Sequence, residues 1–219
     1  MDITYQELKI KLPLEKGVIQ VEDFTLTAMF NCHAIVFMRL LVEEEGIGAL
    51  VNGLSDGAHI KVYEEEILFV GKVTMAAARL IKGIYYLDLT AMSYSVEWGL
   101  EEVSQSFLNL DATYQNVIDK VIAGREGRAD IKDCVTKGTA IPDFLLQYEE
   151  SDWDFLIRMA SHFQSFLVPD YTADYGRAYF GIPNYEEEFI LREEEYSTIK
   201  DMDRYYQVNL SGELLSQEI

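Results

Sequence analysis

The sequence has little cysteine, little proline and few basic residues for its acidic content. In 219 residues there are 2 Cys and 4 Pro, and 18 Lys and Arg stand against 38 Asp and Glu, so the formal net charge is −20. General nucleic-acid binders need clustered Lys and Arg to contact phosphates, so this balance argues against that class. The same charge argues against docking on an anionic membrane surface.

Long apolar segments are missing as well. The chain has no run of about 18 apolar residues, the length that crosses a bilayer as a helix. The N-terminal sequence MDITYQELKIKL has neither the apolar core nor the small-residue cleavage site of a secretory signal. We therefore expect that the protein does not insert directly into a membrane. We also expect that it is assembled in a bacterial cytoplasm.

The two cysteines are far apart and form no C-x-x-C motif. A disulfide between Cys32 and Cys134 is one alternative, but two buried free thiols in a reducing compartment are the interpretation that we favour.

Motifs that carry catalysis or bind metals are absent from the sequence. His33, His59 and His162 have no metal-binding spacing, and we expect each to be a surface or hydrogen-bonded residue. There is no phosphate-binding loop and no serine nucleophile elbow. The sequence therefore predicts no catalytic residue, no metal and no cofactor.

Runs of three glutamates are the most conspicuous polar feature. With 38 acidic residues, some pair will always match the two carboxylates of a glycosidase, so the match carries little weight. We expect the runs to lie at turns and on solvated or partner-facing edges, where charge discourages uncontrolled strand pairing. The runs occupy residues 43–45, 64–66, 186–188 and 193–195.

The chain nevertheless has the composition of a folded protein. Hydrophobic residues make up 49% and aromatic residues 12%, which excludes a disordered acidic tail. A chain of this length buries about 70% of its unfolded surface, enough for one large core or two small ones.

Residues 1–104 have the pattern of β structure. Apolar and polar residues alternate with a period of two, as in half-buried strands of an antiparallel barrel or sandwich. Residues 64–66 fit a short hairpin connection, and residues 46–54 fit a short helix within the β region. The alternating segments are 3–5, 8–12, 24–30, 60–63, 67–70 and 85–91.

Residues 105–165 change to a helical period. A first helix is predicted from a cap at Asp111 or Thr113 to a stop at Gly124. A second helix is predicted from Ser151, with Asp154 completing a capping-box-like pair. Its apolar stripe consists of Trp153, Leu156, Met159, Ala160 and Phe163.

Residues 166–219 return to β signals. Strands are predicted at 166–168, 178–182 and 206–210, and the stretch has room for about four strands, too few to close a second barrel comfortably.

One segment resembles a known family. Residues 141–163, IPDFLLQYEESDWDFLIRMASHF, are similar to the pattern QYxETDWxFLxRLA of the phage late control gene D family. Two further pieces agree: Ser106-Phe107 followed by residues 113–118 resembles the stretch before the family's first helix, and residues 68–73 resemble its strand pattern lFxGxV. The family comprises baseplate hubs of contractile tails, related to type VI secretion spike proteins and to hubs of phage-tail-like bacteriocins (tailocins).

This resemblance implies a fold and an assembly. Family members have two tail-tube-like barrels with helices between them, so we expect an α+β, mainly antiparallel β fold. The implied domains are a first barrel at 1–104, a helical segment at 105–165 and a second, apparently incomplete barrel at 166–219. Members are usually longer, so the chain is either a fragment or a compact hub whose second barrel a partner completes.

The resemblance also implies a structural role without enzyme activity. A homotrimeric ring adapts the hexameric tail tube to the trimeric spike, because two similar barrels per chain give three chains six similar edges. The implied partners are the tail tube protein, the spike protein and baseplate wedge proteins, with no nucleic-acid binding as such. The implied final location is the tail baseplate of a virion or an extracellular injection particle, where a carboxylate-lined lumen would repel acidic cargo.

The motif supplies six candidate interface or structural residues. Three large apolar groups in four helical positions exceed one helix face, so one of them packs against an adjoining barrel or a neighbouring chain, unless all three are intrachain core. Arg158 is placed to pair with Asp154 in an i,i+4 contact of about 0.3–0.5 kcal/mol, or with an acid of residues 149–150 across a boundary. The six candidates are Gln147, Tyr148, Trp153, Phe155, Leu156 and Arg158.

Two other functions remain open on the sequence. One is a cell-wall-degrading enzyme of a tail baseplate, which needs a cleft with a perturbed acid or a metal. The other is a monomeric acidic adaptor, which has no affinity for tube subunits.

Overall fold

The computed structural model describes residues 8–13, 17–54, 57–109, 111–123, 129–141 and 144–183, together with the backbone of three later strands. Residues 8–183 form one compact unit, and the later strands belong to a second unit. The two units are described separately below.

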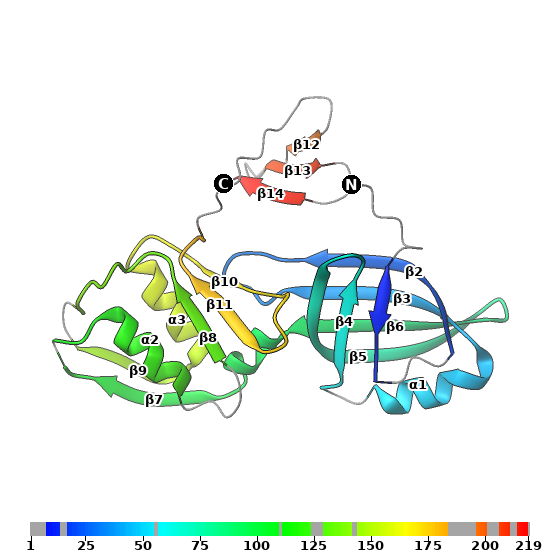
Figure 1. Ribbon diagram of the computed structural model, residues 1–219, viewed down its shortest axis with the longest axis horizontal. Helices are drawn as coiled ribbons and strands as arrows, with labels where there is room; N and C mark the ends of the chain where they lie inside the picture. Colours follow the sequence, from blue (N-terminus) through cyan, green and yellow to red (C-terminus); the bar gives the residue numbers. More distant parts are fainter. Residues whose placement is uncertain are drawn as a thin grey trace. The chain divides into compact units, whose positions relative to one another are not determined.

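A six-stranded antiparallel sheet forms the first part of the larger unit. Figure 1 shows that it is strongly curled, as in half of a barrel. Its strands, in spatial order, are β1 (Lys9–Lys11), β4 (His59–Tyr63), β5 (Ile67–Ile81), β6 (Ile84–Ser93), β3 (Ile35–Val42) and β2 (Val18–Thr27).

The concave face of this sheet holds the first hydrophobic core. Alternate residues of β3 are buried, and helix α1 (Ile47–Gly53), which follows a 3-10 turn at Glu44–Gly46, adds Leu50. The period of two therefore places one set of side chains inside and the other outside. The core includes Val36, Met38, Leu40, Val42, Phe69, Leu87 and Leu89.

Most strands predicted for this region are confirmed. The structure has strands within segments 8–12, 24–30, 60–63, 67–70 and 85–91, although β2 ends at Thr27. Segment 3–5 lies outside the described residues. The turn at residues 64–66 is confirmed, since the Glu64 amide donates to the Glu66 carbonyl at 3.1 Å. The acidic runs 43–45 and 64–66 both lie at turns, whereas the other two are outside the described residues.

A second core lies between residues 94 and 183. Helices α2 (Tyr114–Ala123) and α3 (Asp152–Ser161) lie between a two-stranded and a three-stranded sheet (Figure 1). The two-stranded sheet pairs β7 (Glu102–Phe107) with β9 (Leu145–Ser151). The three-stranded sheet has the order β10 (Leu167–Pro169), β11 (Gly176–Phe180) and β8 (Ala129–Asp133), and its β11–β8 pair is parallel.

The segment 105–165, which was predicted to be helical, also contains the strands β8 and β9 and the second half of β7. The two predicted helices are present. At α2, the Thr113 hydroxyl accepts from the Asn116 amide at 3.3 Å, which selects Thr113 over Asp111 as the cap. The predicted stop at Gly124 lies outside the described residues.

The later strands form an antiparallel sheet of their own. Its order is β12 (Tyr196–Lys200), β13 (Tyr206–Leu210) and β14 (Leu214–Glu218), which confirms the predicted strand at 206–210. The strands predicted at 166–168 and 178–182 correspond to β10 and β11. The fold is α+β and mainly antiparallel β, as predicted; the proposed domain boundaries stay a prediction.

Both cysteines are free thiols, as predicted, but Cys32 is exposed, so its predicted burial is wrong. It lies in the loop between β2 and β3, where the chain turns at the surface. Within the described part of the chain, no helix is both long and apolar enough to cross a membrane.

Candidate functional site

The start of α3 is held by its predicted cap. The Ser151 hydroxyl accepts from the Asp154 amide at 3.1 Å and donates to the Asp154 carboxylate at 2.6 Å. The cap satisfies an amide that has no partner within the helix, and it fixes where β9 becomes α3.

The three large apolar residues of the motif are buried inside the chain. Phe155 stacks on Phe107 of β7 with ring centroids 5.6 Å apart. Trp153 points elsewhere: its ring lies 4.3 Å from the His33 ring, and its indole N–H donates to the Asn31 carbonyl at 3.3 Å. Trp153 therefore packs against the loop that enters β3. Trp153, Phe155 and Leu156 are thus all buried within the chain, which is the second of the two alternatives given above.

Arg158 pairs with Glu150 rather than with Asp154. Its Nε and Nη2 donate to the two Glu150 carboxylate oxygens at 3.0 and 2.7 Å, and Nη2 also donates to the Leu146 carbonyl at 2.6 Å. The hydrogen bonds to Glu150 raise the pKa of Arg158. The bidentate pair connects α3 to β9; of the two predicted alternatives the acid is Glu150 and not Asp154, and the contact lies within the chain rather than across a boundary.

Gln147 is a buried polar link within the same element pair. Its amide nitrogen donates to the Glu150 carbonyl and the Asp152 carboxylate, both at 2.9 Å, and its oxygen accepts from Gln105 at 2.7 Å. These bonds satisfy the side chain inside the chain.

Tyr148 points outward from β9 and is 64% exposed. Leu146 on the same strand face and the flanking Phe144 and Leu108 are exposed as well. Of the six candidates, Tyr148 is thus the one on an open surface, and the interface role of all six stays a prediction.

The outer face of the six-stranded sheet carries an ion cluster that the sequence did not reveal. Asp88 is 2% exposed and lies between two arginines. Arg39 Nε and Nη2 donate to its two oxygens at 2.7 and 3.1 Å, and Arg79 Nε lies 2.6 Å from Oδ2. The hydrogen bonds from Arg39 outweigh the effect of burial and lower the pKa of Asp88. The trace of this cluster in the sequence is that Arg39 and Asp88 each interrupt a mostly apolar strand.

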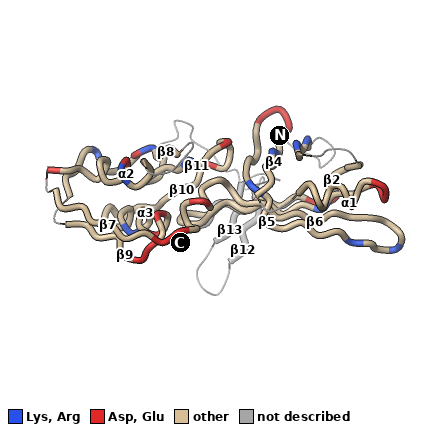
Figure 2. Tube along the Cα trace, turned by 90° about the horizontal axis from the view of Figure 1, so that it is seen from below, with Lys and Arg blue, Asp and Glu red and all other residues tan. Residues whose placement is uncertain are grey.

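The β5–β6 hairpin extends beyond the rest of the sheet. Its turn uses Lys82 at φ 51° and Gly83 at φ 82°, two residues that adopt the left-handed region. Figure 2 shows basic residues at this tip, in contrast to the acidic turns elsewhere in the protein. The hairpin exposes four large apolar side chains: Met75, Leu80, Ile81 and Ile84.

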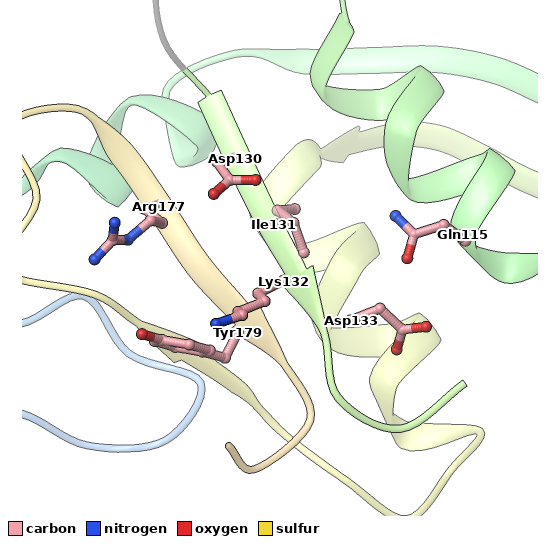
Figure 3. A pocket seen from close by; sticks show the side chains of 7 residues that line it. All are labelled: Gln115, Asp130, Ile131, Lys132, Asp133, Arg177 and Tyr179. Carbon is pink, nitrogen blue, oxygen red and sulfur yellow. The ribbon is translucent and has the colours of Figure 1, made fainter. Parts of the chain in front are cut away.

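A polar pocket of about 590 Å³ lies over β8 and β11 (Figure 3). Its basic side chains already have partners: Arg177 Nε donates to Asp170 at 2.7 Å, and Lys132 lies 6.0 Å from the Tyr179 ring centre. Asp170 is buried, which raises its pKa, but hydrogen bonds from Thr172 and Arg177 lower it below the ordinary range. The pocket is lined by Gln115, Asp130, Ile131, Lys132, Asp133, Arg177 and Tyr179.

The histidines are hydrogen-bonded, as expected. His162 contacts the Tyr114 hydroxyl at 2.8 Å, His59 contacts the Tyr94 hydroxyl, and His33 contacts the Ser95 hydroxyl at 3.0 Å. Burial lowers the pKa of His33 to about 4 against the opposing charge of Asp154. Among the described residues, no three His, Cys, Asp or Glu side chains gather in a metal-binding group.

No family model and no curated protein matches the sequence. Solved structures do match by fold. The Escherichia coli c3393 protein, a type VI secretion component similar to the T4 bacteriophage tail proteins gp27 and gp5, superposes with a TM-score of 0.64 at 12% identity, over 87% of this chain and 54% of its own.

Two tail proteins are also similar. The 43 kDa tail protein of prophage MuSo2 from Shewanella oneidensis has a TM-score of 0.58 at 13% identity, over 79% of this chain and 54% of its own. A tail protein from Neisseria meningitidis MC58 has a TM-score of 0.57 at 12% identity, over 78% and 50%. The chain thus spans about half the length of each, and it shares the fold of phage tail proteins and of a type VI secretion component.

Proposed function

We propose that this protein is a structural hub subunit of a contractile phage tail or a phage-tail-like injection particle. In this role three copies form a ring on the particle axis, between the hexameric tail tube and the trimeric spike. Baseplate wedge proteins contact the outside of the ring.

The shared fold is the observation that carries this proposal, because it covers 78 to 87% of the chain in three tail or secretion proteins. The resemblance of residues 141–163 to the hub pattern supports it independently. The motif residues build the β9–α3 junction, so their contacts serve a scaffold. A scaffold of this kind fits a part that works by shape and subunit count.

Co-expression with the tube and spike proteins from the same gene cluster tests the proposal. We expect the chain to purify in a particle and an electron-microscopy map to place three copies on the axis, between tube and spike. A position away from the axis would contradict the proposal, as would hydrolysis of purified peptidoglycan by the isolated chain.

A further inference from the structure

Besides the three-residue edge strand β1, the six-stranded sheet has two open strand edges in the described part of the chain. Strand β4 pairs with β5 only as far as Lys72, and beyond the irregularity at Thr74 the segment Met75–Ile81 pairs only with β6. At the far side of the sheet, β2 pairs only with β3. Each edge presents backbone donors and acceptors that another strand could use.

The charges between these edges alternate across the sheet. In register, Asp23 of β2 lies opposite Arg39 of β3, and Arg39 lies opposite Asp88 of β6. Arg79 of β5 then reaches diagonally to Asp88. The row reads acid, base, acid, base, and its two ends are an acid on the β2 edge and a base on the β5 edge.

The ends of this row are complementary to each other but cannot meet within one sheet. Arg79 uses Nε toward Asp88, and a guanidinium has further N–H donors in its planar fork. Glu22 beside Asp23 is exposed, and Lys82 lies at the turn next to the β5 edge. Two copies in head-to-tail contact would therefore place opposite charges side by side.

Apolar side chains flank both edges. Leu80 on β5 is 59% exposed and Ile19 on β2 is 55% exposed. An edge that is long, apolar and unpaired is a site for strand addition rather than a solvated border.

We propose that the Met75–Ile81 edge of β5 receives strand β2 from a second copy of this chain. Three antiparallel steps separate β5 from β2 within one copy. In a ring whose copies all point the same way along the axis, the added β2 is therefore antiparallel to β5 and extends the sheet across the junction. Asp23 of the second copy then follows Arg79 in the charge row. The contact is heterologous, so it repeats from copy to copy and closes into a ring where the rotation between copies is that of the proposed trimer. This inference deepens the proposed function, on which it rests, by naming the surfaces through which the copies meet.

Charge reversal on the full-length chain tests the pairing. We expect Arg79→Glu and Asp23→Lys each to weaken self-association at least about tenfold in sedimentation velocity, because each puts like charges together. The double variant Arg79→Glu/Asp23→Lys should recover most of the loss, although these two residues lie at opposite sides of the sheet in one copy. Lys137 is exposed in the turn after β8. The variant Lys137→Glu makes the same charge change as Arg79→Glu and should leave self-association unchanged.

Melting temperatures separate folding from association, since Arg79→Glu also removes a partner of Asp88 within the chain. An Arg79→Glu chain that stays folded and associates as the unaltered chain does would overturn the proposal. So would a double variant no better than the singles, or an unaltered chain that stays monomeric at the highest soluble concentration.

Disulfide trapping in the co-expressed particle distinguishes the two proposals. Thr25→Cys and Ala77→Cys, which lie opposite each other when Asp23 is beside Arg79, should give a ladder of linked copies on a denaturing gel when combined with Cys32→Ser and Cys134→Ser. Axial incorporation without a ladder overturns the edge pairing and leaves the hub role intact. A ladder from the chain alone without incorporation overturns the hub role and leaves the pairing intact.

Discussion

Ser151 makes two hydrogen bonds with Asp154 at the point where a strand becomes a helix. Replacing it by alanine removes both bonds and leaves the Asp154 amide without its partner. We expect Ser151→Ala to lower the free energy of unfolding by about 1 kcal/mol in urea titrations. Ser151→Thr keeps a capping hydroxyl and should lose much less, whereas an equal loss in both variants would contradict the capping role.

His33 makes the protein sensitive to mild acid. Its pKa is about 4 in the folded chain because of burial, below the ordinary value of 6.5, so the unfolded chain binds the proton first. The stability that depends on neutral His33 is complete above about pH 6.5 and falls as the pH decreases toward about 4. Unfolding measured from pH 7 to pH 4 should show this decline.

The variant His33→Gln isolates this effect, because glutamine keeps a hydrogen-bonding group toward Ser95 and does not titrate. It should flatten the dependence of stability on pH between 6.5 and 4, while the fall at lower pH, where Asp88 and Asp170 become protonated, persists. An unchanged slope in this window would show that His33 does not cause it.

At the scale of elements, Asp88 joins three strands through two arginines. The change Asp88→Asn keeps the shape of the side chain but removes the charge that both arginines face. We expect it to cost about 1–2 kcal/mol of stability, because the arginines are partly exposed and water screens part of the interaction. Denaturant unfolding against Asp130→Asn, a change at an exposed site of β8, measures the difference; equal stabilities would contradict the clamp.

Elements with clear periodicity could be predicted from the sequence, and those without it could not. Strand β4 and residues 87–91 of β6 alternate between apolar and polar residues, and α3 carries both a cap and an apolar stripe. Strand β3, IVFMRLLV, was missed because its outer face is also apolar, so no alternation is visible. Strands β7 and β8 are short and polar, and their pairing partners are distant in sequence.

The candidate site was predictable only in part, because contacts between residues of different elements depend on how the chain folds. The motif located α3 but not the strand β9, and it left two alternatives for the partner of Arg158. The choice of Glu150 over Asp154 depends on how β9 and α3 fold back on each other. The charge row could not be found without the register of β2, β3 and β6, because its members are far apart in the chain.

For the larger unit as a whole, Asn31 connects the two cores. Its amide donates to the Leu167 carbonyl and its side-chain oxygen accepts from the Leu167 amide, each at 2.8 Å. Its φ of 60° is in the left-handed region, which asparagine tolerates and alanine does not. We expect Asn31→Ala to cost about 2–3 kcal/mol and to split thermal unfolding into two steps.

Asn31→Gly serves as the control, because it tolerates the backbone conformation and loses only the side-chain bond. Its loss should be smaller than that of Asn31→Ala. A single, unshifted calorimetric transition for Asn31→Ala would show that the two cores are coupled by other contacts.

The contact between Asn31 and Leu167 can form only late in the synthesis of the larger unit. Asn31 and Leu167 are 136 positions apart, so a ribosome adds 136 residues after Asn31 before the partner of Asn31 exists. During that interval the strands of the first sheet are translated, yet the loop that enters β3 lacks its partner in the second core, and incompletely folded chains expose apolar surface to their neighbours. The period of vulnerability on a polysome therefore lasts until translation has passed Leu167.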